Sequence, residues 1–66
     1  MKKVKVIAEF IKWNGEKVQF EVKREWAQDI ADAVIGQFTF IDNKSGFAIR
    51  GSDFAHVDIY EVAVWD

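Results

Sequence analysis

The stretch EWAQDIADAVIGQ, residues 25–37, decides the fold because it is the one part of the chain with a helical pattern. Its large apolar residues Trp26, Ile30 and Val34 recur every four positions, so they lie one above another on a single helix face. Gly36 follows, and glycine most easily takes the left-handed conformation that ends a helix. We therefore expect one helix, which ends at Gly36.

The residues before this helix predict a β-hairpin. Two alternating apolar and polar stretches, residues 2–13 and 17–23, flank the turn sequence Asn14-Gly15. A two-residue turn would place Glu9 against Phe20 and would mismatch the two faces. A type I turn with a glycine bulge at Gly15 shifts the register by one residue and matches them. The bulged turn is favoured, and it predicts these pairs: Val6 with Val22, Ala8 with Phe20, Phe10 with Val18, Ile7 with Glu21, Glu9 with Gln19 and Lys12 with Glu16.

This register assigns the two faces of the hairpin. The predicted core face, onto which the helix packs, carries Val4, Val6, Ala8, Phe10, Val18, Phe20 and Val22. The opposite face carries Ile7, Ile11 and Trp13 among Lys and Glu. Three large apolar side chains on the solvent side require an explanation. Either another strand or subunit covers them, or they form a binding surface.

The residues after the helix predict three more strands. A four-residue loop, DNKS at residues 42–45, would join residues 38–41 to 46–50 and pair Phe40 with Phe47 and Phe38 with Ile49. Residues 51–53 interrupt the chain, and we expect Ser52 to cap a short turn. The last strand, residues 56–65, is apolar on both faces, which is typical of a strand covered on both sides. One helix cannot cover both faces, whereas a second copy of the chain can.

These elements predict an α+β fold in a single domain, residues 1–66, with the order β-β-α-β-β-β and one helix packed on an antiparallel sheet. A chain of 66 residues buries only about 60% of its unfolded surface, so its own core is marginal. Cysteine is absent, which excludes disulfides and thiolate metal sites. Half of the residues are hydrophobic and ten are aromatic. We therefore expect a homodimer or a higher oligomer.

Hydropathy and net charge argue against a membrane-spanning protein and against general nucleic-acid binding. No apolar stretch approaches the about 18 residues of a membrane span, and the start of the chain alternates Lys with Val. We therefore expect a cytoplasmic protein. The net charge of −2 argues against general nucleic-acid binding. This net charge is the sum of two parts of opposite sign. Residues 1–24 contain seven Lys or Arg and three Glu, a charge of +4, whereas residues 25–66 contain two Lys or Arg and eight Asp or Glu, a charge of −6.

The sequence contains no strong signal for catalysis. His56 is the only histidine, and on a strand it shares a face with Asp58, as a base oriented by a carboxylate would. Neither a nucleophile nor oxyanion donors accompany this pair. No recurring ligand spacing indicates a metal, and the loop at residue 42 lacks the glycine of a calcium loop. We expect no enzyme activity, no cofactor and no metal site.

One resemblance suggests an alternative function. Residues 44–49, KSGFAI, and 53–57, DFAHV, are similar to the aromatic strand pair of cold-shock domains, where exposed rings on a basic sheet stack single-stranded bases. This chain departs from that family in its helix and its few basic residues. The resemblance suggests a second hypothesis, nucleic-acid or nucleotide binding, which requires Phe38, Phe40 and Phe47 to be exposed with Lys44 and Arg50 beside them.

The first hypothesis is a small non-catalytic protein-binding module, an adaptor or inhibitor that covers a surface of a larger cytoplasmic protein. The chain resembles short accessory proteins of phages and mobile elements in its size and in its lack of cysteine or motif. Its expected anchors are Ile7, Ile11 and Trp13, because partly exposed aromatic and apolar groups dominate such contacts. The acidic helix face, Glu25, Asp29 and Asp32, would form an electrostatic rim.

Overall fold

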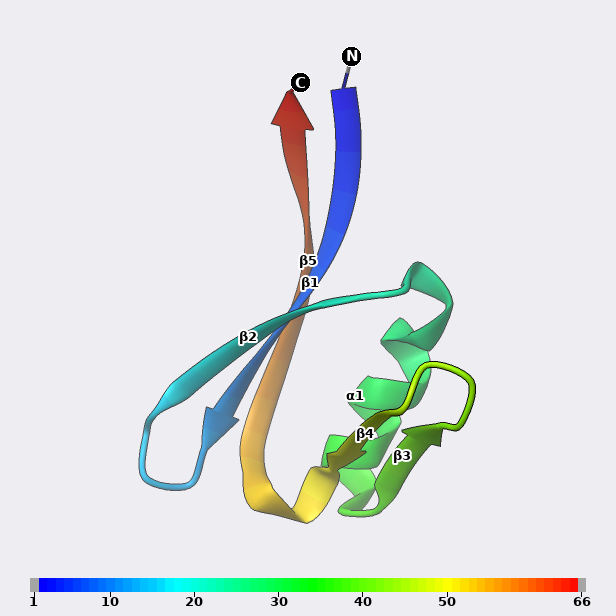
Figure 1. Ribbon diagram of the computed structural model, residues 1–66. Coiled ribbons are helices and arrows are strands. Elements are labelled where there is room, and N and C mark those ends of the chain that lie inside the picture. Colours follow the sequence, from blue (N-terminus) through cyan, green and yellow to red (C-terminus); the bar gives the residue numbers. More distant parts are fainter. Residues whose placement is uncertain (1, 66) are drawn as a thin grey trace.

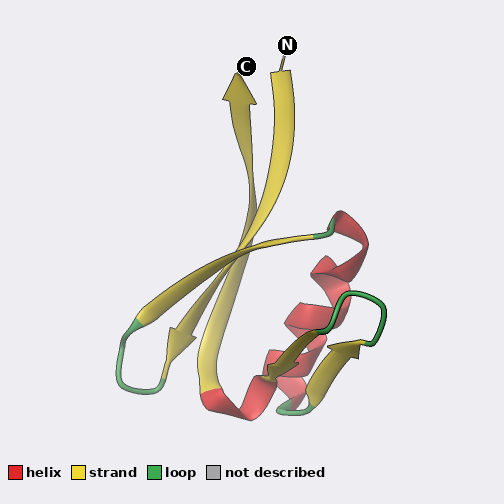
Figure 2. Ribbon diagram, in the orientation of Figure 1, coloured by secondary structure: helices red, strands yellow, loops and turns green. Residues whose placement is uncertain are grey.

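The computed structural model, which describes residues 2–65, contains the expected order of strands and helix (Figures 1 and 2). Strands β1 and β2 precede one α-helix, and strands β3, β4 and β5 follow it. The elements are β1 (Lys2–Lys12), β2 (Lys17–Val22), the 3-10 turn η1 (Arg24–Trp26), α1 (Ala27–Gly36), β3 (Thr39–Asp42), β4 (Phe47–Arg50), the 3-10 turn η2 (Gly51–Asp53) and β5 (Phe54–Trp65). The predicted α+β class is confirmed.

The strands form two antiparallel sheets around the helix. The larger has the order β2-β1-β5, and β3 and β4 form a separate hairpin. β2 pairs with β1 from Val6 to Ile11, whereas β5 pairs with β1 from Lys2 onward. The ends of β1 and β5, residues 2–5 and 62–65, therefore project beyond β2 and α1 as a two-stranded ribbon, the terminal arm (Figure 1).

The first hairpin has the predicted bulged turn and register. The backbone N–H of Gly15 donates to the carbonyl of Lys12 at 2.9 Å, and Gly15 takes a positive φ of 91°. The N–H of Lys12 donates to the carbonyl of Glu16 at 2.8 Å. Val6 lies opposite Val22, as the matching of faces requires. Packing on one face thus selects the turn.

The helix ends at Gly36, as predicted, but the left-handed residue lies one position later. Gln37, not Gly36, takes the left-handed conformation, with φ 56° and ψ 44°. The N–H of Phe38 donates to the carbonyl of Ala33 at 2.9 Å, which completes a Schellman arrangement. A Cβ at Gly36 would lie 2.8 Å from the ring of Phe38. Glycine is therefore used here for the close approach of that ring, and Gln37 takes the strained position.

The second hairpin differs from the predicted register by two residues. Phe40 pairs with Ile49 instead of Phe47, and Asp42 pairs with Phe47, so that the loop covers residues 43–46. The Asp42 carboxylate accepts bonds from the Ser45 hydroxyl at 2.7 Å and from the Ser45 N–H at 3.0 Å. These two bonds hold the pKa of Asp42 below its ordinary value. A shift of two residues keeps each side chain on its expected face.

The turn after β4 also differs from the prediction. It covers Gly51–Asp53, so Ser52 lies inside the turn and makes no capping bond, and β5 begins at Phe54. Gly51 is buried, and its N–H donates to the carbonyl of Phe38 at 2.9 Å. The turn therefore packs against the C-terminal end of α1.

The core lies between the larger sheet, α1 and the second hairpin. Trp26, Ile30 and Val34 are all buried, as their spacing predicts. Val4 and Phe20 lie on the predicted core face but remain nearly half exposed; Val4 belongs to the terminal arm, beyond α1. The core cluster comprises Val6, Ala8, Phe10, Val22, Trp26, Ile30, Val34 and Ile49, with Phe40, Phe47, Phe54, Val57 and Ile59 packed around it.

Candidate functional site: an apolar groove beside the helix

On the outer face of the larger sheet, Ile7 and Ile11 do not form a continuous exposed apolar surface. Ile7 lies between Glu21 on β2 and Tyr60 on β5, and both Ile7 and Ile11 are half buried. Between the two isoleucines, Gln19 donates to the Glu9 carboxylate at 2.6 Å and to the Tyr60 hydroxyl at 3.2 Å. Polar groups from three strands therefore interrupt the predicted apolar surface.

Trp13 lies apart from the two isoleucines, at the tip of the first hairpin. Its indole Nε1–H donates to the carbonyl of Ser52 at 2.9 Å, which turns the ring toward η2 and α1. The side chain remains 63% exposed. Trp13 therefore lies beside η2 and α1, and it is not part of the outer face that carries Ile7 and Ile11.

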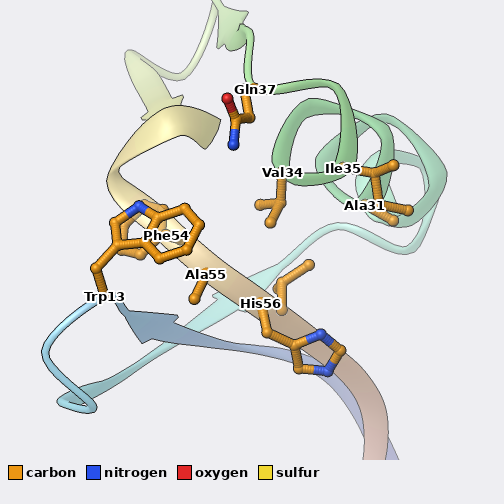
Figure 3. Close-up of a pocket in the computed structure, with 9 residues that line it drawn as sticks. Trp13, Ala31, Val34, Ile35, Gln37, Phe54, Ala55 and His56 are labelled. Carbon is orange, nitrogen blue, oxygen red and sulfur yellow. The ribbon is translucent and has the colours of Figure 1, made fainter.

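Trp13 forms one wall of an open groove between α1 and the beginning of β5 (Figure 3). The groove has a volume of about 200 Å³. The remaining lining residues come from the helix, its C-terminal cap and the first residues of β5: Ala31, Val34, Ile35, Gln37, Phe54, Ala55, His56 and Val57. Its walls are thus largely apolar, with polar groups from Gln37 and His56.

Ile35 is the residue of this site that the sequence pattern did not reveal. It lies beside the buried Val34 but is 82% exposed at the side of the groove. A large aliphatic residue in such an exposed helical position contributes little to the core. The sequence did contain one signal: Ile35 is a large apolar residue that lies outside the buried stripe of Trp26, Ile30 and Val34.

The predicted acidic rim spans η1 and α1. Glu25 lies in η1 beside Arg24, Asp29 and Asp32 lie on α1, and all three acidic residues are exposed; α1 itself contains no Lys or Arg. Gln28 donates to the Asp32 carboxylate at 2.9 Å. The negative charge therefore lies on the element that also supplies Ala31 and Ile35 to the groove.

His56 and Asp58 form the contact expected from their spacing. The His56 Nε2 and an Asp58 carboxylate oxygen are 2.7 Å apart, and both side chains are more than half exposed. His56 also borders the groove. Among residues 2–65, no cluster of three or more His, Cys, Asp or Glu has the proximity that a metal ion needs.

The aromatic residues of the second hairpin are divided between the core and the surface. Phe47 stacks on the buried Trp26 with ring centroids 5.0 Å apart, and Phe40 lies 5.8 Å from the same ring. Phe38 is half exposed, and Lys44 and Arg50 are exposed. A base-stacking surface needs exposed rings, and of the three candidates Phe38 best meets this requirement.

Comparison of the chain with known proteins gives no relative from which a function could be inferred. No protein-family model matches the chain, and no curated protein or solved structure matches it. Within residues 2–65, no helix has the length and apolar character needed to cross a membrane.

Proposed function

We propose that this chain is a small non-catalytic protein-binding module, an adaptor or inhibitor of a larger cytoplasmic protein, and that it acts as a homo-oligomer. The observation that carries the proposal is the groove, where the exposed Trp13 and Ile35 flank an apolar floor. Aromatic and aliphatic groups at the rim of a concave surface are typical anchors of protein contacts.

The chemistry of the groove defines the partner. Its volume of about 200 Å³ suits one large apolar side chain. The acidic helix face favours Lys or Arg beside that anchor, and the C-terminal end of α1 adds a partial negative charge. Burial of one such side chain contributes about 2 kcal/mol. Stable binding therefore also needs the surrounding rim.

A displayed library of random peptides, selected on the immobilised protein, tests this proposal. We expect the selected peptides to share one large apolar residue flanked by Lys or Arg. The strongest of them is then synthesised, and its affinity is measured by NMR from the shifts of the backbone amides and of the Trp13 indole N–H. The absence of a consensus, or an acidic one, would contradict the proposal.

Two matched variants locate the binding site. Ile35→Lys should weaken the selected peptide at least tenfold, because it removes an apolar contact and places a positive charge beside the Lys or Arg that flanks the anchor. Ile41→Lys makes the same change at an exposed isoleucine of β3 that does not line the groove, and it should have little effect. Equal losses in both variants would place the binding site elsewhere.

A further inference from the structure

We propose that two copies of the chain associate through the free edge of β5, which would pair antiparallel with β5 of the partner subunit around a twofold axis at Val62. This inference rests on the self-association included in the proposed function.

The β5 edge lacks the residues that usually protect an edge strand. β5 is 12 residues long and has β1 as its only sheet neighbour within the described structure. It contains no proline, lysine or arginine, which are common protections against edge pairing. The opposite edge of the terminal arm, on β1, carries Lys2, Lys3 and Lys5. Charge therefore discourages pairing at β1 and leaves β5 as the favoured edge.

The backbone of β5 defines which registers can form hydrogen bonds. The N–H and carbonyl of Lys12 both bond to residues on the β2 side of β1. Because these groups alternate along a strand, the even-numbered residues of β1 direct their N–H and carbonyl groups to β2, and the odd-numbered residues of β1 direct theirs to β5. Lys5 therefore shares its bonds with Val62, which lies opposite. By the same alternation, Ala63 directs its N–H and carbonyl to the free edge. A partner strand must bond to the odd-numbered residues of β5.

Side chains then favour a register centred on Val62 over the one centred on Glu61. Centring the pair on Glu61 would place two carboxylates directly opposite each other, and like charges there are destabilising although each Glu61 also pairs with Arg24 of its own chain. Centring it on Val62 removes this repulsion, places Glu61 opposite Ala63, and places apolar or aromatic groups opposite each other in the other pairs. The resulting pairs, with the second residue from the partner subunit, are Val62 with Val62, Tyr60 with Val64, Glu61 with Ala63 and Ile59 with Trp65.

This register also covers apolar surface that a single copy leaves open. Trp65 is 73% exposed, and Val62 and Tyr60 are exposed on the other face. Because the terminal arm projects past β2 and α1, two arms can lie side by side with the helices at opposite ends (Figure 1). Trp65 then packs beside Ile59 of the partner subunit. Apolar side chains on both faces of β5 thereby gain cross-strand neighbours.

Disulfide trapping tests the register, because the chain has no cysteine. Directly opposite residues that do not share hydrogen bonds have Cα atoms about 4.5 Å apart, within reach of a disulfide. Val62→Cys should therefore give a covalent dimer under mild oxidation. Val64→Cys is the matched control on the same strand and face; its two thiols would be separated by about 13 Å along the strands. Equal crosslinking of both variants would overturn the register.

A second experiment tests the edge. Ala63→Pro removes an N–H that points away from β1, so the monomer should keep its fold while the dimer is lost. Light scattering over a dilution series gives the mass, and circular dichroism reports the fold. If Ala63→Pro unfolds, Val62→Lys replaces it and places two ammonium groups at the twofold axis. A natural chain that is monomeric at all concentrations, or a dimer that persists in the folded edge variant, would overturn the proposal.

The proposed dimer and the proposed peptide-binding groove can be tested independently. Ala63 and Val62 do not line the groove, so monomeric variants should still bind the selected peptide. Conversely, Ile35→Lys should lose the peptide and keep the dimer. Peptide binding without a dimer would reject the present inference and the self-association in the proposed function but not the groove, and a dimer without peptide binding would reject only the groove.

Discussion

Gly51 packs directly against the carbonyl of Ala33: a Cβ on Gly51 would lie 1.9 Å from that oxygen. Contact this close joins η2 to the C-terminal end of α1 and leaves no space for any side chain. The N–H of Gly51 also donates to the carbonyl of Phe38, so the turn is held at two points. The groove depends on this junction, because it lies between α1 and β5, the strand that follows η2.

Gly51→Ala should therefore destabilise the domain strongly. The added methyl group meets backbone atoms that cannot rotate away, and overpacking of this kind costs about 3 kcal/mol. Urea denaturation measures the loss. Gly46→Ala is the control, because Gly46 has a positive φ of 78° but open space around it, and its cost should be nearer 1 kcal/mol. Equal costs would show that the close approach to Ala33 is unimportant.

Gln37→Gly should stabilise the domain by about 0.5 to 1 kcal/mol. Gln37 has a positive φ, and glycine takes this conformation without the steric conflict of a Cβ. The midpoint of urea unfolding should rise while its slope stays constant. Gln37→Ala keeps the Cβ and should bring no gain. A gain in both variants would instead implicate the removed amide side chain.

Phe47→Leu should cost about 1 to 2 kcal/mol, because it removes the stacked contact with Trp26. Phe38→Leu changes a half-exposed ring and should cost less than half as much. Thermal unfolding followed by circular dichroism compares the two variants. The reverse order of costs would mean that Phe47 is the more exposed ring. It would also revive the base-stacking surface suggested by the resemblance to cold-shock domains.

The parts of the fold that could be predicted are those in which many side chains share one constraint. In the first hairpin, a slip of one residue would expose the entire core face, so the register followed from the pattern alone. The helical stripe of Trp26, Ile30 and Val34 is determined in the same way. Several burial preferences agree in each case, and no single contact decides the outcome.

The parts that could not be predicted depend on single local contacts. The register of the second hairpin follows from two bonds between Asp42 and Ser45, and a shift of two residues leaves the pattern of faces unchanged. The helix end follows from the space that the ring of Phe38 needs beside Gly36. The groove escaped prediction for a related reason, because Trp13 reaches it through one bond to Ser52 across 39 residues of sequence.

The hydrogen bonds of Asp42 predict a pH dependence confined to acid. Both bonds from Ser45 favour the charged carboxylate, so the pKa of Asp42 is lower in the folded chain than in the unfolded one. Asp42 then stabilises the second hairpin above the unfolded pKa of about 3.9, and this contribution is lost as the pH falls through the lower folded pKa. A carbon-detected NMR titration of the Asp42 carboxyl group measures the folded value. Ser45→Ala should raise that pKa toward the ordinary range, whereas Asn43→Ala, which leaves both Ser45 bonds in place, should not change it. An unchanged titration in Ser45→Ala would show that these bonds do not stabilise the charged form.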